Sequence, residues 1–100
     1  MTFFSNRIYR INADGSQQSI GSPLSAHDRH GAYALAEWAR GLGLPEEAYD
    51  YIDNCWLKLT VSPADLAKYL RAFAKPGGAD DFIAQIDCEH GLYLIEAEEF

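Results

Sequence analysis

The sequence contains few cysteines and no long hydrophobic run, and each shortage removes a class of protein. Its two cysteines, Cys55 and Cys88, stand far apart, so neither a disulfide scaffold nor a paired-cysteine zinc site is indicated. We expect both thiols to be reduced and packed. No apolar stretch approaches the roughly 20 residues that span a bilayer, and the first residues lack a signal-peptide pattern. We therefore expect a cytoplasmic protein with no membrane contact.

Basic residues are also scarce, with 8 lysines and arginines against 15 acidic residues, which gives a net charge of −7. The imbalance lies in residues 45–100, which carry −8, whereas residues 1–44 carry +1. Direct nucleic-acid binding is not expected, because phosphate recognition needs a basic surface. Two explanations stay open: the acidic residues keep the protein soluble, or they form a surface that faces a basic partner.

Motifs for phosphate binding and acid–base catalysis are missing as well. Gly41 and Gly43 follow a predicted helix, as do Gly77 and Gly78, whereas phosphate-binding glycine loops open one. The carboxylates are numerous but form no recognisable catalytic pair. These absences argue against a nucleotide-dependent enzyme.

Two histidines, His27 and His30, come nearest to a metal site, because residues three apart are neighbours on a helix surface. Cys88 and His90, or Cys55, could complete such a site. Without tighter ligand spacing we expect solvated histidines and no metal. Cys88 beside His90 also lacks an orienting group or an oxyanion hole, so no nucleophile is indicated. We predict a protein that is not an enzyme and needs no cofactor.

What the sequence does contain is a strand followed by a capped helix. Residues 55–61 alternate between apolar positions and a second set that includes Trp56 and Lys58, which predicts a strand with one buried face. Ser62 then fits a helix N-cap. The apolar spacing that follows predicts a helix that ends before the Pro-Gly-Gly of residues 76–78.

The rest of the chain predicts two hairpins and a second helix. Residues 44–53 are ambiguous, and we favour a short helical turn or loop there over a strand. The order β-β-α-β-α-β-β predicts one α+β domain over residues 1–100: a mainly antiparallel sheet of about five strands with two helices on one face. The first predicted hairpin pairs residues 2–12 with 16–20, and the second pairs residues 81–87 with 92–97. The predicted helix spans residues 25–42, with Ser25 as its N-cap.

Aromatic residues interleaved with carboxylates mark the candidate binding surface. Such surfaces combine aromatic anchors with a charged rim. The candidate partner-binding residues are Glu46, Glu47, Tyr49, Asp50, Tyr51, Asp53, Trp56, Asp87, Glu89, Glu96 and Glu98.

These features predict a small acidic protein that covers a basic surface of a protein partner, such as a nuclease or a nucleic-acid-binding complex. Immunity proteins and anti-CRISPR proteins, of bacterial or phage type, share this profile, which is an analogy of composition alone. The alternative is a small-molecule-sensing or structural accessory domain. It could be a monomer or a homodimer that pairs through an edge strand.

Overall fold

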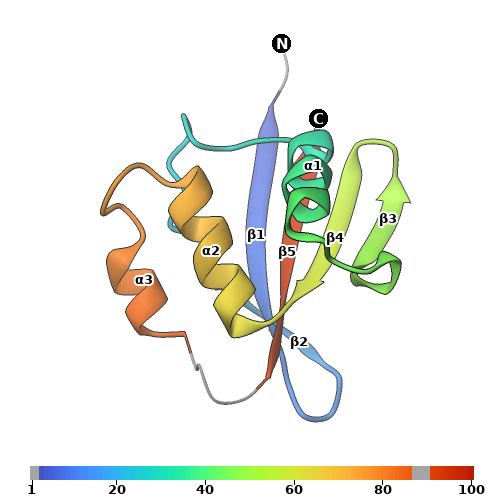
Figure 1. Cartoon of the computed structure of the whole chain (residues 1–100), viewed down its shortest axis with the longest axis horizontal. Helices are drawn as coiled ribbons and strands as arrows, with labels where there is room; N and C mark the ends of the chain where they lie inside the picture. The colour runs from blue at the N-terminus through green and yellow to red at the C-terminus, as the bar shows by residue number, and fades with distance from the viewer. Residues whose placement is uncertain (1–2, 87–90) are drawn as a thin grey trace.

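The computed structural model describes residues 3–86 and 91–100, and its strands form one antiparallel sheet. Figure 1 shows the helices on the same side of this sheet. This arrangement confirms the predicted α+β class. In chain order the elements are β1 (Phe4–Ile11), β2 (Gln17–Gly21), α1 (Ala32–Leu42), the 3-10 helix η1 (Glu46–Ala48), β3 (Tyr49–Asp53), β4 (Trp56–Val61), α2 (Pro63–Phe73), α3 (Asp80–Ala84) and β5 (Leu92–Glu99).

The sheet order is β2-β1-β5-β4-β3, with every neighbouring pair antiparallel. The last strand of the chain therefore lies at the centre, between β1 and β4. β5 was expected to pair in a hairpin with residues 81–87, and that pairing is wrong. The two edges of the sheet are β2 and β3 (Figure 1).

The core fills the space between the sheet and the helices. Every second residue of β4 and β5 points toward this space, because side chains alternate along a strand. The apolar side chains of α1 and α2 recur at helical spacing and face the same space. Each fully buried leucine contributes about 1.5–3 kcal/mol through the hydrophobic effect. The residues with no measurable exposure are Leu35, Ala39, Leu57, Leu59, Leu66, Tyr69, Leu70, Ile95 and Ala97.

The strand–helix unit formed by β4 and α2 agrees with its sequence prediction. Leu57, Leu59 and Val61 are buried while the alternate residues are half-buried. The Ser62 hydroxyl accepts a hydrogen bond from the Asp65 backbone N–H at 3.1 Å, so the predicted N-cap is confirmed. Cys55 was expected on the buried face, but it precedes the strand and is exposed.

The first helix begins later than predicted, at Ala32 and not after Ser25. Ser25 forms a turn, in which its hydroxyl donates to the Asp28 carboxylate at 2.9 Å. The side-chain amide of Asn6 then accepts from the His30 backbone N–H and donates to the His30 carbonyl, at 3.0 and 2.9 Å. These bonds hold the His30 backbone against β1, and the N-cap Gly31 that follows is extended, so the helix begins only at Ala32.

The segment predicted as a strand at residues 81–87 begins as the helix α3, Asp80–Ala84. Phe82, Ile83 and Ile86 pack against the core. Ile83 and Ile86 follow Phe82 by one and four residues, which places all three on one side of a helix. Ala84 is exposed, although strand alternation would have buried it with Phe82. The fifth strand of the sheet is instead β3. The turn or loop favoured for residues 44–53 is therefore correct only for the part before Tyr49 and is wrong for residues 49–53.

Candidate partner-binding site

The face of the sheet opposite the helices is called the open face here. Trp56, Lys58 and Thr60 alternate with the buried residues of β4 and therefore point to it. On β5 the residues in register with Trp56 and Lys58 are Glu98 and Glu96. No helix of the described residues covers this face, as Figure 1 shows.

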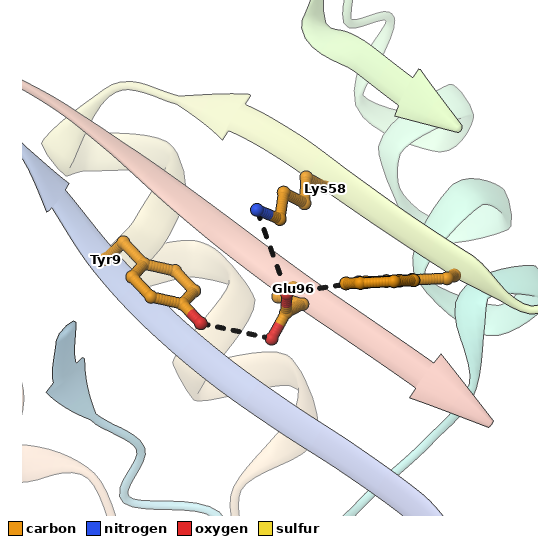
Figure 2. A network of polar contacts seen from close by, with 4 residues as sticks. Tyr9, Lys58 and Glu96 are labelled. Carbon is orange, nitrogen blue, oxygen red and sulfur yellow. Dashed lines mark hydrogen bonds and ion pairs between the residues drawn. The ribbon is translucent and has the colours of Figure 1, made fainter. Parts of the chain in front are cut away.

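Glu96 lies at the centre of the open face and is only 4% exposed. Its carboxylate accepts hydrogen bonds from the Trp56 indole N–H at 3.0 Å and from the Tyr9 hydroxyl at 3.3 Å. The Lys58 ammonium lies 4.0 Å from the same carboxylate. Figure 2 shows Tyr9 and Lys58 reaching Glu96 from the strands on either side. A buried carboxylate needs such donors, because burial without them is strongly unfavourable.

Two cations offset the charge of Glu96. Lys58 lies 5.6 Å from the centre of the Tyr9 ring, so it leans toward β5 and β1 and away from β3. Arg7 stands opposite Glu96 on β1. The Tyr9 hydroxyl and then the charge of Glu96 raise the pKa of Arg7. A cation on each neighbouring strand therefore offsets the buried charge of Glu96.

The margin of the open face next to β3 carries carboxylates. Asp50 pairs with Lys58 across the sheet, and a register shift sets Asp53 opposite Trp56. Asp53 also shapes the β3–β4 turn, because its carboxylate accepts from the Cys55 backbone N–H at 2.7 Å. With Glu98 on the other side of Trp56, this aromatic residue has a carboxylate in register on each neighbouring strand.

The predicted tyrosines lie on the other side of β3. Tyr49 and Tyr51 pair with Leu59 and Leu57, so they point to the helix-covered face. Their rings stack with centres 6.2 Å apart. Arg40 of α1 donates to the Tyr51 hydroxyl at 3.0 Å and lies 5.9 Å from the centre of the Tyr49 ring. These tyrosines therefore fasten β3 to α1 and do not join Trp56.

The structure thus brings only some of the predicted site residues together. Asp50, Asp53, Trp56 and Glu98 meet on the open face, while Glu46 and Glu47 are exposed on η1 just before β3. Glu96 was expected on an exposed rim, and that placement is wrong because Glu96 is buried. Asp87 and Glu89 lie outside the described residues.

Sequence reasoning missed Tyr9 and Lys58, which hold Glu96 in place together with Trp56. Tyr9 is 87 residues from Glu96 in the chain and Trp56 is 40 residues from it. The alternation in residues 55–61 did place Trp56 and Lys58 on one face. Nothing in it indicated that a buried carboxylate would lie beside them.

The histidine cluster does not form a surface site. His30 is 7% exposed, stacked on Phe73 at 4.0 Å, and its Nε2 lies 3.1 Å from the Tyr69 hydroxyl. Burial lowers the pKa of His30 to about 4, so the ring is neutral at pH 7 and fits a tautomer in which Nε2 accepts from Tyr69. Burial also raises the pKa of Tyr69. Solvation was expected for both histidines and is wrong for His30, whereas His27 is exposed.

The described residues hold no group of three His, Cys, Asp or Glu side chains able to bind a metal ion. The proposed pairing of Cys88 with His90 lies outside the described residues. Within residues 3–86 and 91–100, no helix is long and apolar enough to cross a membrane.

Comparison of the chain with protein-family models, with curated proteins and with solved structures returned no match. A function for this chain must therefore be inferred from the site geometry.

Proposed function

We propose that this protein is a non-enzymatic binding protein that covers a basic surface of a protein partner, such as a nuclease or a nucleic-acid-binding complex. An inhibitory role of the immunity-protein or anti-CRISPR kind is the form this function would take. The observation that carries the proposal is Trp56, half-buried on the open face with Glu98 and Asp53 in register on either side.

The centre of this surface is preorganised for binding. Trp56 and Tyr9 both donate to the buried Glu96 carboxylate, so their rings are fixed before a partner arrives. Tryptophan and tyrosine in fixed positions are frequent binding hot spots, because little side-chain entropy is lost when a partner covers them. This supports contact by packing at the centre of the open face.

The margin supplies the charge preference. Lys58 leans toward Glu96 and away from Asp50, which leaves Asp50 exposed beside Asp53. Glu46 and Glu47, on η1 just before β3, add two further exposed carboxylates. With a net charge of −7, the protein would also attract a basic partner over distance and speed the encounter.

Affinity capture from a bacterial lysate, followed by mass spectrometry, tests this function. The intact protein is compared with a variant in which Glu46, Glu47, Asp50 and Asp53 are changed to lysine. The intact protein should enrich a basic or nucleic-acid-associated partner that the variant loses. The complex should weaken steeply as salt rises, because charges are screened within about 10 Å at 0.1 M.

A matched control separates local charge from net charge. In the second variant, four exposed acidic residues away from the site, Asp14, Glu37, Asp80 and Asp81, are changed to lysine. This variant has the same net charge and should keep the partner. Equal loss in both variants, or capture without any basic protein, would contradict the proposal.

The small-molecule-sensing alternative has a hollow between α3 and the sheet, lined by Ile20, Phe82, Ile86 and Tyr93 among others. Its volume of about 120 Å³ is below the roughly 300 Å³ at which small-molecule pockets begin. A second hollow, lined by Ile11, Asn12 and Leu92 among others, measures about 400 Å³ and is large enough for a small molecule. The dimeric accessory alternative is favoured by the exposed edge of β3 and predicts a concentration-dependent mass in sedimentation.

A further inference from the structure

We propose that the partner contributes an extended basic segment that pairs with the free edge of β3 and adds a sixth strand to the sheet. This inference rests on the proposed function for the existence of a basic partner. It adds how the partner binds and which pattern of residues is recognised.

The two edges of the sheet differ in what they offer. β2 has the sequence QQSIG, without a charged residue, and its pairing with β1 is irregular where Gly21 takes φ +81°. β3 holds two exposed apolar side chains, Tyr51 at 50% and Ile52 at 44% exposure. Exposed apolar residues on an unpaired edge favour the addition of another strand.

The backbone of β3 is available on its outer side. Among the described residues β3 pairs only with β4, and Figure 1 places it at the right-hand margin of the sheet. Main-chain hydrogen bonds supply the affinity when a segment adds to such an edge, and alternate side chains supply the specificity. The carboxylates of β3 therefore decide which segment fits.

The side chains of β3 predict an alternating partner sequence. Asp50 and Asp53 are in register with the open-face residues Lys58 and Trp56, so partner residues on that face should be basic. Partner residues on the other face would lie beside Tyr51, whose hydroxyl already binds Arg40. Those positions should be apolar or uncharged, because a second cation there would repel Arg40. A basic residue at every second position is the expected motif.

A second copy of this chain is a poorer occupant of the edge. It would bring the carboxylates of two β3 strands together in a protein that already carries a charge of −7. Charged residues on an edge strand are a known means of preventing such self-pairing. A basic strand turns the same residues into attractive contacts.

The probe is a synthetic peptide, acetyl-Thr-Arg-Val-Arg-Val-Arg-Thr-amide, added to the full chain labelled with ¹⁵N. We expect saturable shifts of the β3 backbone amides in NMR spectra and slower hydrogen exchange at the outward-facing amides of β3. The amides of β2 serve as the internal reference and should not change. The indole signal of Trp56 should shift, whereas that of Trp38, on the helix side, should not.

A peptide of the same sequence, N-methylated at alternate residues on its pairing edge, separates strand addition from simple charge attraction. It keeps the three arginines but cannot donate the main-chain hydrogen bonds. Its affinity should be lower by about tenfold or more, because several main-chain hydrogen bonds are lost.

The charge preference is tested by the double variant D50N/D53N, in which the new amide side chain at position 53 can still accept from the Cys55 backbone N–H. Removal of the two carboxylate charges should weaken peptide binding by about tenfold. The control variant D80N/D81N removes the same charge at α3 and should change the affinity by less than about twofold.

Three results would overturn strand addition: equal binding of both peptides, protection at β2 instead of β3, or no binding of the unmethylated peptide. Self-association of the chain that protects the β3 amides without peptide would overturn it in favour of a second copy. These peptide experiments do not test whether a basic partner exists. The proposed function is tested separately, by capture with the charge-reversal variants.

Discussion

The two faces of the sheet bury ionisable side chains by different means, as His30 and Glu96 show. On the helix-covered face, His30 is stacked on Phe73 and meets the Tyr69 hydroxyl, within an otherwise apolar core. On the open face, Glu96 meets donors from Trp56, Tyr9 and Lys58. Apolar packing on the covered face stabilises the fold, while the polar network of the open face fixes two aromatic rings.

This difference separates the residues that fold the protein from those that we propose for binding. Substitutions on the covered face should unfold the protein. Substitutions at the acidic margin should leave it folded. The change in the free energy of unfolding distinguishes the two groups. It should be large for core substitutions and almost zero for substitutions at the acidic margin.

The largest effect is expected from a leucine on the covered face. Leu57→Ala removes a side chain of 0% exposure and leaves a cavity in the core. The free energy of unfolding should fall by about 2–5 kcal/mol, measured by urea denaturation. Leu92→Ala, at 47% exposure near the start of β5, is the matched control and should cost well under half as much. Equal losses would mean that the open face is packed as tightly as the covered face.

The second effect is a loss of stability in acid caused by His30. Its pKa is about 4 in the folded protein and 6.5 in its ordinary state, so the unfolded chain binds more protons between these values. The contribution is fully present above pH 6.5 and is lost as the pH falls to about 4. The loss amounts to about 3 kcal/mol.

The control for this pH dependence is the same substitution at two histidines. His30→Gln should remove the part of the acid slope that lies between pH 6.5 and 4, whatever its effect on stability at pH 7. His27→Gln changes an exposed histidine and should leave the slope as it is in the unmodified protein. An unchanged slope in His30→Gln would show that His30 is not the titrating group.

The third effect concerns the polar network of the open face. Glu96→Ala leaves the Trp56 indole and the Tyr9 hydroxyl without their acceptor, so the free energy of unfolding should fall by about 1–3 kcal/mol. Glu96→Gln keeps an acceptor and should cost less. The fluorescence of a Trp38→Phe background, which reports Trp56 alone, should show a more mobile indole in the alanine variant. An unchanged signal would contradict the role of Glu96 in fixing Trp56.

The sequence predicted some of these features because their causes are local. In β4 and α2, strand alternation, the Ser62 N-cap and helix periodicity lie close together in the chain and agree with one another. Residues 81–86 form a short segment in which Phe82, Ile83, Ala84 and Ile86 are apolar, so strand and helix spacings fit almost equally well. Packing against the core decided for the helix there.

The candidate site was predictable only in part, for the same reason. Asp50, Asp53 and Trp56 are close in sequence and lie together in the structure. The burial of Glu96 depends on Tyr9 and Trp56, which are distant in the chain, and on the central place of β5 in the sheet. The placement of the His30 backbone likewise depends on a residue of β1, 24 residues away. Contacts of this kind follow from strand order, which no local pattern specified.

The smallest effect is expected at the acidic margin and decides what its charges are for. Asp50→Asn and Asp81→Asn each remove one exposed carboxylate and should change the free energy of unfolding by less than about 0.5 kcal/mol. If both charges serve solubility alone, the two variants should also precipitate at equal protein concentrations and bind the basic peptide equally. If the margin of β3 recognises a basic strand, only Asp50→Asn should weaken peptide binding. If the two variants are equally stable and equally soluble but only Asp50→Asn binds the peptide more weakly, the carboxylate of Asp50 serves to recognise the basic strand.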